Sequence, residues 1–209
     1  MTKKTFQLLL ASRSPRRRSI LKEAGFLSRS ISSNSSESFN ENLTIDQNLK
    51  AIARDKVQAV ANKLSPRKRK EFLILGADTV VVVGKTVLGK PKNSSDARRM
   101  IGLLEGKRHH VKTAFCIYCP SEEAWIMRVV TTKVGFRRLS KDEVQWYVST
   151  KEPFDKAGAY AIQGLAQHFV NFINGDFLNV VGLPLDAIEK EIGKHNWSLK
   201  KRSRKNRSG

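Results

Sequence analysis

The longest β-rich segment of the chain constrains its fold most. Residues 72–91 read FLILGADTVVVVGKTVLGKP, and Val, Ile and Leu are the side chains that pack well on a pleated strand. Gly84 and Lys85 interrupt the segment and predict a tight hairpin turn. Asp78 then becomes an ionisable group near the end of a very apolar strand. The desolvation cost of a carboxylate in such a place makes it the first residue to explain.

A strand, loop and helix are expected at the amino terminus. FQLLLA, residues 6–11, is a short apolar run bounded by polar residues, which is typical of a buried strand. Ser14 can cap a helix that has Pro15 at its first position, and Gly25 ends that helix. The arginines at 16–18 fall in its first turn, where the helix dipole already presents partial positive charge. A bound anion would reverse that unfavourable arrangement.

The rest of the chain alternates between helical and extended patterns. Helices are expected at about 46–64, 95–104, 140–148, where Ser140 and Glu143 form a capping box, and 184–193. Strands are expected at 109–118 and 124–138, with a further strand pair around Asn174-Gly175. The serine-rich residues 28–38 are expected as a loop and residues 65–71 as a basic linker. These elements predict a single α/β domain over residues 1–195, with a mixed, partly antiparallel twisted sheet flanked by helices.

The charge of the chain favours anionic partners. Its 39 Lys and Arg against 19 Asp and Glu give a net charge of +20, which fits nucleic acid, acidic surfaces or phosphorylated small molecules. Only six of these 39 basic residues lie in the last ten positions, so most of the positive charge is distributed along the rest of the chain. Residues 196–209 are expected to be a basic, disordered tail.

No apolar run approaches the roughly 20 residues of a membrane span. The amino terminus is also unlike a secretory signal, because its apolar patch is short and arginines follow it at once. A cytoplasmic protein without membrane contact is therefore expected. Cys116 and Cys119 are expected to face opposite sides of a strand as ordinary thiols. Of the adjacent His109 and His110, one ring should be packed and the other exposed.

Three polar clusters fall in loops or at strand ends. Arginine and lysine side chains suit phosphate oxygens, and a helix N-terminus adds backbone donors. The sequence therefore predicts a polyphosphate-binding site, in a cleft at the ends of the strands. The clusters are Ser12, Ser14, Arg16 and Arg17; Asp78, Thr79 and Lys90; and Lys156, Tyr160 and Gln163.

The residues alone leave alternatives open. Asp78 is either a group with a partner, metal or catalytic role, or an ordinary aspartate in a turn. The arginines are either anion ligands or a solvated basic face. Glu37 is either a metal ligand or a solvated side chain in the polar loop.

Four motifs in order resemble the Maf family of nucleotide pyrophosphatases, from about Leu8 to about Leu185. They are LASRSPRR, GADTVVV with LGKP, KEPFDKAGAYAIQG and NVVGLPL. The resemblance implies a fold like that of inosine triphosphate pyrophosphatases, with a central nucleotide-binding cleft. It also implies hydrolysis of a nucleoside triphosphate between the α and β phosphates.

The resemblance also implies roles for particular residues. Asp78 is expected to be the proton acceptor, and Arg16, Thr79 and Gln163 stand where substrate preference is decided, here in favour of dTTP and UTP. A divalent cation, Mg²⁺ or Mn²⁺, is expected on Glu37 and Asp78, although the letters NSSE replace the usual DxDE pattern before Glu37. The expected phosphate ligands are Ser12, Arg17, Lys56, Lys90 and Lys156.

A second function class stays open beside the hydrolase. The basic tail could bring the protein to nucleic acid, or the fold could serve a regulator of cell division. Against this, the sequence has no recognisable module that reads DNA. A homodimer is also left open.

Overall fold

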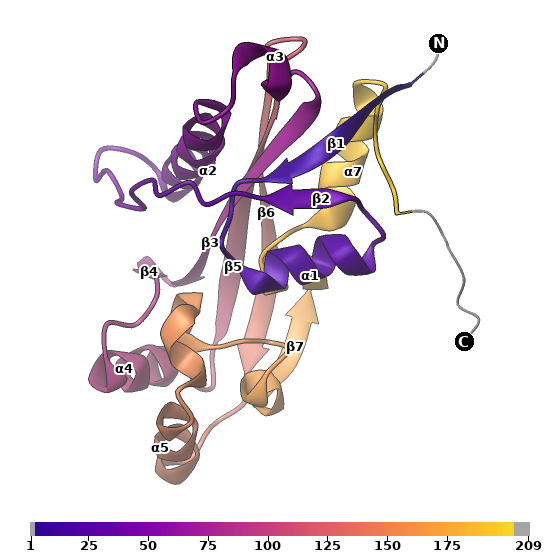
Figure 1. The fold of residues 1–209 in the computed structure, drawn as a ribbon. Helices are drawn as coiled ribbons and strands as arrows, with labels where there is room; N and C mark the ends of the chain where they lie inside the picture. Colours follow the sequence, from indigo (N-terminus) through magenta and orange to yellow (C-terminus); the bar gives the residue numbers. More distant parts are fainter. Residues whose placement is uncertain (1–2, 203–209) are drawn as a thin grey trace, which may run out of the picture. The chain divides into compact units, whose positions relative to one another are not determined.

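The structure is a computed structural model that describes residues 3–202. Its eight-stranded sheet has the order β2-β1-β3-β5-β6-β7, with β4 paired to β3 and β8 paired to β1 (Figure 1). The sheet contains parallel and antiparallel pairs, so the mixed α/β fold predicted from the sequence is confirmed. The chain forms two compact units, and β3, β5 and β6 contribute residues to both. The first consists of Met1–Asp78, Ala114–Val129 and Leu185–Gly209, and the second of Thr79–Thr113 and Val130–Pro184.

The first unit is built around β1, which has three parallel neighbours. Leu8 of β1 pairs with Ser28 of β2 on one side and with Leu73 of β3 on the other, while Lys4 pairs with Trp197 of β8. Leu8, Leu9 and Leu10 are almost completely buried, as the apolar run predicts. The elements of this unit are β1 (Lys4–Leu10), α1 (Pro15–Glu23), β2 (Ser28–Ser30), α2 (Ile45–Ala61), α3 (Pro66–Arg69), the start of β3 (Phe72–Val83), α7 (Leu185–Lys194) and β8 (Trp197–Leu199).

The helices of the first unit begin where the sequence places their caps. Ser14 accepts a hydrogen bond from the backbone N–H of Arg17 at the start of α1, and Thr44 forms a capping box with Gln47 at the start of α2. Gly25 has a φ of +79° directly after α1, a conformation that glycine adopts at little cost. The strand, loop and helix predicted at the amino terminus are therefore confirmed.

The second unit contains the hairpin of β3 and β4 and the ends of β5 and β6. Val83 pairs with Thr86 across Gly84-Lys85, as predicted. Ser140 and Glu143 form the predicted capping box of α5. The elements are β4 (Thr86–Leu88), α4 (Ser94–Leu104), β5 (Arg108–Cys119), β6 (Ala124–Phe136), α5 (Lys141–Ser149), the 3-10 turns η1 (Glu152–Asp155), η2 (Ala157–Ala159) and η3 (Leu165–Phe169), β7 (Val170–Asn174) and α6 (Phe177–Val181).

The prediction of a hairpin at Asn174-Gly175 is wrong. Strand β7 ends at Asn174, and helix α6 follows instead of a second strand. The reason is local, because the side chain of Asp176 accepts a hydrogen bond from the backbone N–H of Asn179 and caps the helix.

Two segments expected as irregular carry short elements. Residues 28–30 of the expected serine loop form β2, and residues 66–69 of the expected linker form α3 behind the N-cap Ser65. The expected disordered tail from residue 196 also differs from the structure at its start. Residues 197–199 form β8 because the Trp197 ring is buried against Phe6 of β1. Residues 203–209 of that tail lie outside the described part.

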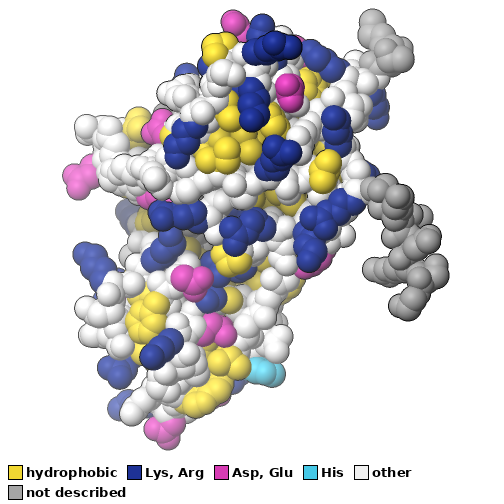
Figure 2. Space-filling model, in the orientation of Figure 1, with side chains coloured by type: hydrophobic (Ala, Val, Ile, Leu, Met, Phe, Trp, Pro, Cys, Tyr) yellow, Lys and Arg dark blue, Asp and Glu magenta, His cyan; other side chains and the backbone are white. Residues whose placement is uncertain are grey.

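The other expectations concern cysteines, histidines, charge and membrane contact. Cys116 and Cys119 are both buried, reduced thiols on β5, and His109 is buried whereas His110 is exposed, as predicted. Figure 2 shows Lys and Arg side chains spread over the visible face rather than gathered in one patch. Within residues 3–202, no helix is long and apolar enough to cross a membrane.

Candidate active site

A buried lysine holds two carboxylates together in the first unit. Lys56 Nζ lies 2.6 Å from Asp78 Oδ1 and 2.7 Å from Glu37 Oε1. The side chains of Lys56 and Asp78 are 7% and 11% exposed, whereas that of Glu37 is 48% exposed. In such a poorly solvated place each charged group needs an oppositely charged partner, since an unpaired buried charge is costly. The predicted acid therefore has a partner, which argues against an ordinary aspartate in a turn.

The close approach of α2 to β3 sets this geometry. A Cβ built on Gly76 would lie 2.7 Å from the backbone oxygen of Ala53 and 2.7 Å from Val57 Cγ2. Only glycine allows the helix to lie so near the strand. Lys56 projects from the buried face of α2, so its ammonium group reaches the carboxylate two residues beyond Gly76.

The first turn of α1 brings a guanidinium group to the same part of β3. This part is the middle of the strand and not its end, where the sequence analysis expected Asp78, because β3 runs without a break from Phe72 to Val83. Arg17 Nη1 donates to the backbone oxygen of Ala77 at 2.8 Å and to Ser12 Oγ at 3.4 Å. Ser12 Oγ also accepts from the backbone N–H of Ser14 at 3.1 Å. Desolvation lowers the pKa of Arg17, while the nearby carboxylates of Asp78 and Glu37 oppose that shift. Arginine stays charged under such perturbations.

Five predicted site residues thus lie together in the first unit: Ser12, Arg17, Glu37, Lys56 and Asp78. Arg16 precedes Arg17 in the same helical turn and is half-buried. The arrangement joins carboxylates that can take a proton to cations that can bind phosphoryl oxygens.

The two predicted metal ligands converge on one cationic atom, Lys56 Nζ. Throughout residues 3–202, no group of three or more His, Cys, Asp and Glu side chains could hold a metal ion. Two carboxylates that share one position of positive charge fit Mg²⁺, which is often bound by one or two carboxylates plus water and substrate phosphates. The donor set therefore fits an ion that arrives with a polyphosphate.

The remaining predicted residues belong to the second unit. Gly158 donates its N–H to the backbone oxygen of Gly89 at 2.9 Å, and this bond holds the segment of Lys156 beside that of Lys90. Lys156 Nζ donates to the backbone oxygen of Glu152 at 2.6 Å and pairs with Asp155. Gln163 and Lys90 are both exposed.

Thr79 begins the second unit and is half-buried on an otherwise buried stretch of β3. Its Oγ1 lies 2.9 Å from Oγ1 of Thr113, a buried hydroxyl that also donates to the backbone oxygen of Asn179 at 3.1 Å. The sequence analysis did not select Thr113 or Asn179. Neither residue is charged, so neither was selected as a candidate site residue. For Thr113, a polar side chain on an apolar strand was a usable signal.

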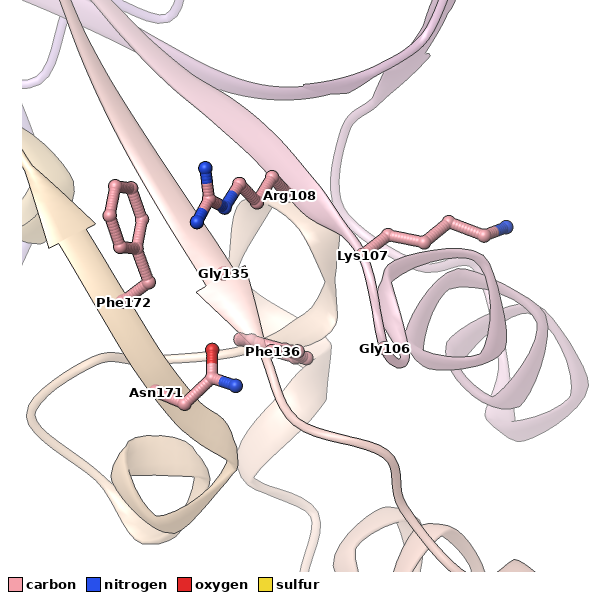
Figure 3. A pocket seen from close by; sticks show the side chains of 7 residues that line it. All are labelled: Gly106, Lys107, Arg108, Gly135, Phe136, Asn171 and Phe172. Carbon is pink, nitrogen blue, oxygen red and sulfur yellow. The ribbon is translucent and has the colours of Figure 1, made fainter.

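A pocket in the second unit contains none of the predicted site residues. It is lined by Gly106, Lys107, Arg108, Gly135, Phe136, Asn171 and Phe172. Figure 3 shows the Arg108 guanidinium group turned toward the Phe172 ring and the Lys107 side chain turned away. The guanidinium carbon lies 4.1 Å from the centre of that ring. The charge of Arg108 therefore already makes a cation–π contact within this pocket.

The comparison with known proteins decides the family. The family model described as Maf-like protein matches residues 7–195 of this chain. The chain belongs to the Maf family. The resemblance drawn from the four motifs is therefore confirmed, and the matched range includes every element of the second unit and, in the first unit, all except β8 and the start of β1.

Curated relatives of this Maf-like chain carry the name dTTP/UTP pyrophosphatase. A protein of Bdellovibrio bacteriovorus is 42% identical over 187 residues, which cover 90% of this chain and 97% of the relative. A protein of Caldicellulosiruptor bescii is 42% identical over 195 residues, covering 93% and 98% of the two chains. A Geobacillus relative is 40% identical over 191 residues, covering 91% and 99%.

Proposed function

We propose that this protein is a nucleoside triphosphate pyrophosphatase that hydrolyses dTTP and UTP to the monophosphate and pyrophosphate. The observation that carries the proposal is the ion-pair cluster of Asp78, Lys56 and Glu37 beside Arg17. The relatives named dTTP/UTP pyrophosphatase, at about 40% identity over nearly the whole chain, support the same reaction.

The reaction needs a base for the attacking water. The water oxygen forms a bond to the α-phosphorus, the bond between that phosphorus and the bridging oxygen breaks, and pyrophosphate leaves. Asp78 takes the proton from the water in this scheme. Lys56 already binds one oxygen of that carboxylate at 2.6 Å, so it orients Asp78 for this role.

The reaction also needs positive charge near the phosphoryl oxygens. Arg17 and Lys56 supply it in the first unit, and Lys90 and Lys156 are the proposed phosphate ligands of the second. The Ser12 hydroxyl holds Arg17 and is a further proposed donor. When bound, Mg²⁺ or Mn²⁺ on Glu37 and Asp78 would neutralise charge on the substrate phosphates.

Substrate preference is assigned to Arg16, Thr79 and Gln163, the positions indicated by the family resemblance. Each offers side-chain hydrogen-bonding groups suited to a nucleotide. A cytoplasmic location, a homodimer and nucleic-acid binding through the basic tail remain predictions from the sequence. The hydrolase is favoured over the regulator because two of its expected phosphate ligands, Lys56 and Arg17, bind Asp78 and the backbone oxygen of Ala77.

A substrate panel tests the proposed function. The protein would be incubated with dTTP, UTP, CTP, ATP and GTP with Mg²⁺ or Mn²⁺, and pyrophosphate release measured. Asp78→Asn should reduce kcat by about 10²-fold or more, in line with the loss of a general base. Asp55→Asn is the matched control, because Asp55 is an exposed carboxylate that directly precedes Lys56 in α2.

Lys56→Met and Lys50→Met form a second matched pair on α2. Lys56 is buried in the ion-pair cluster, whereas Lys50 is half-exposed. Loss of activity is expected only for the first. A folded wild-type protein that releases no pyrophosphate from any triphosphate, or an Asp78→Asn protein with wild-type activity, would contradict the proposal.

A further inference from the structure

A single carboxylate closes the segment of the second unit that carries Lys156. We propose that Glu152 is a positioning residue, whose carboxylate joins the two ends of residues 152–165 and so holds the Lys156 ammonium group in place for a phosphate oxygen of the substrate. The inference rests on the proposed function, because it concerns how one of the phosphate ligands proposed there is held.

Both oxygens of the Glu152 carboxylate accept hydrogen bonds. Oε2 accepts from the backbone N–H of Leu165, 13 residues further along the chain, at 3.0 Å, and Oε1 accepts from Tyr147 Oη on α5 at 3.1 Å. Tyr147 is completely buried. Burial and the charge of Glu152 raise the pKa of this tyrosine, so its hydroxyl keeps the proton that it donates. The carboxylate therefore fastens both ends of the segment to α5.

A glycine makes room for this carboxylate. A Cβ built on Gly164 would lie 2.6 Å from both Cδ and Oε2 of Glu152. Gly164 has a φ of −116°, a backbone conformation that any residue can adopt. The close approach of the carboxylate is therefore the reason that this position suits glycine.

The main chain of Glu152 binds the lysine directly. Lys156 Nζ donates to the Glu152 backbone oxygen at 2.6 Å and pairs with Asp155, and the Lys156 side chain is only 14% exposed. An ammonium group has three protons, so two such bonds leave one for a phosphoryl oxygen. Because the acceptor of the first bond belongs to Glu152, the contacts that fix Glu152 also fix the ammonium group.

The middle of the segment is held by other contacts. Gly158 donates its N–H to the backbone oxygen of Gly89 at 2.9 Å, and the buried Tyr160 Oη lies 2.8 Å from the buried His109 Nε2. These bonds do not involve the carboxylate, so its loss should free the ammonium group without unfolding the second unit. An ammonium group that is already ordered loses less conformational entropy when a phosphate binds.

Glu152→Gln keeps the size of the side chain and changes its acceptors. An amide has one acceptor oxygen, so either the Leu165 N–H or the Tyr147 hydroxyl then faces an NH₂ group. KM for UTP should rise about tenfold, the size of one hydrogen bond to a charged group. Because Asp78 and Lys56 lie in the first unit, kcat should change by less than about threefold, as for a loss of binding alone.

A second variant reaches the carboxylate from the opposite side. Gly164→Ala should raise KM in the same way, because its Cβ displaces the Glu152 carboxylate. The matched controls are Glu189→Gln, which changes an exposed carboxylate on α7, and Gly102→Ala, where the new Cβ meets nothing within 4 Å. Both controls should keep KM within about twofold of wild type, as expected for substitutions away from such contacts.

A double variant separates positioning from a merely structural role. Lys156→Met removes the group that Glu152 holds, so adding Glu152→Gln to it should raise KM by less than about twofold more. A structural effect would instead multiply with that of Lys156→Met. The proposal is overturned, while the pyrophosphatase function stands, if Glu152→Gln or Lys156→Met alone keeps the wild-type KM, or if the full effect of Glu152→Gln recurs in the double variant.

Tripolyphosphate binding gives the same comparison without turnover. In calorimetric titrations with Mg²⁺ present, Kd for tripolyphosphate should rise about tenfold in Glu152→Gln, and equal affinity of this variant and wild type would overturn the proposal. The result is readable even if the wild type releases no pyrophosphate from UTP, so a failure of the proposed function is distinguishable from a failure of this one. Circular dichroism and a thermal melt establish folding, and Gly164→Ala supplies the test if Glu152→Gln does not fold.

Discussion

The contact between Gly76 and α2 predicts that one methyl group will disturb the fold and the site together. In Gly76→Ala the new Cβ would lie 2.7 Å from Ala53 O and from Val57 Cγ2. Ordinary carbon contacts lie at about 3.5–4.0 Å, so the helix and strand must separate by roughly 1 Å. Overpacking of this kind costs about 1–3 kcal/mol of the free energy of unfolding.

The displacement should also reach Asp78, the proposed proton acceptor. Lys56 projects from the displaced part of α2, and its Nζ is only 2.6 Å from Asp78 Oδ1. A shift of about 1 Å lengthens this charged hydrogen bond, and misplacement by that amount can cost about 10²-fold in rate. We therefore expect kcat to fall by one to two orders of magnitude, more than the stability loss alone explains.

Gly102→Ala is the matched control, with the opposite expected sign. Gly102 lies inside α4, and a Cβ there meets nothing within 4 Å. Alanine in a helix interior should raise the free energy of unfolding by about 0.5–1 kcal/mol. Urea unfolding followed by circular dichroism measures both variants, together with pyrophosphate release. A Gly76→Ala protein that is as stable and active as wild type would refute the close-approach argument.

Three further predictions concern other parts of the structure. Ser14→Ala removes the cap that accepts from the Arg17 N–H and should lower the free energy of unfolding by about 1 kcal/mol, measured by urea titration. Gly158→Ala should cost more, because Gly158 has a φ of +67° and its Cβ would lie 2.7 Å from Val81 Cγ2; a thermal melt equal to that of wild type would contradict this. Burial lowers the pKa of His109 from 6.5 to about 4, so the folded protein refuses a proton that the unfolded chain binds. The contribution of His109 to the free energy of unfolding should be fully present above about pH 6.5, and the free energy should fall by up to about 3 kcal/mol as the pH drops toward 4. In His109→Gln the urea midpoint should instead be nearly constant between about pH 6.5 and 5.

The local rules predicted most of the elements that carry the site. The N-cap Ser14 with Pro15, the β-rich residues 72–83 and the capping box at Ser140 each need only neighbouring residues, and all three are found. A partner for Asp78 was one of the two alternatives that the residues left open, because an aspartate in an apolar strand is costly without one. That the partner is Lys56 depends on how α2 packs, which Gly76 alone hints at in the sequence.

The failures came from interactions that no local pattern encodes. Strand β8 forms because Trp197 pairs with Lys4, which lies near the other end of the chain. The strand propensity of residues 197–199 cannot predict a pairing with so distant a segment. Asn174-Gly175 correctly marks the end of strand β7, but a helix capped by Asp176 follows it. The apolar residues of this helix are of the kinds that also favour a strand. Thr113 and Asn179 escaped notice because their hydrogen bonds join β5 to α6, far apart in sequence.

The lysine between the two carboxylates has a consequence for how an anion could enter. Glu37 and Asp78 alone would repel a triphosphate, yet Lys56 lies against both, and Arg16 and Arg17 are carried by the adjoining helix turn. Three positive groups thus outnumber two negative ones before any metal arrives. Encounter with a polyanion should consequently be assisted by attraction and should slow as ionic strength rises.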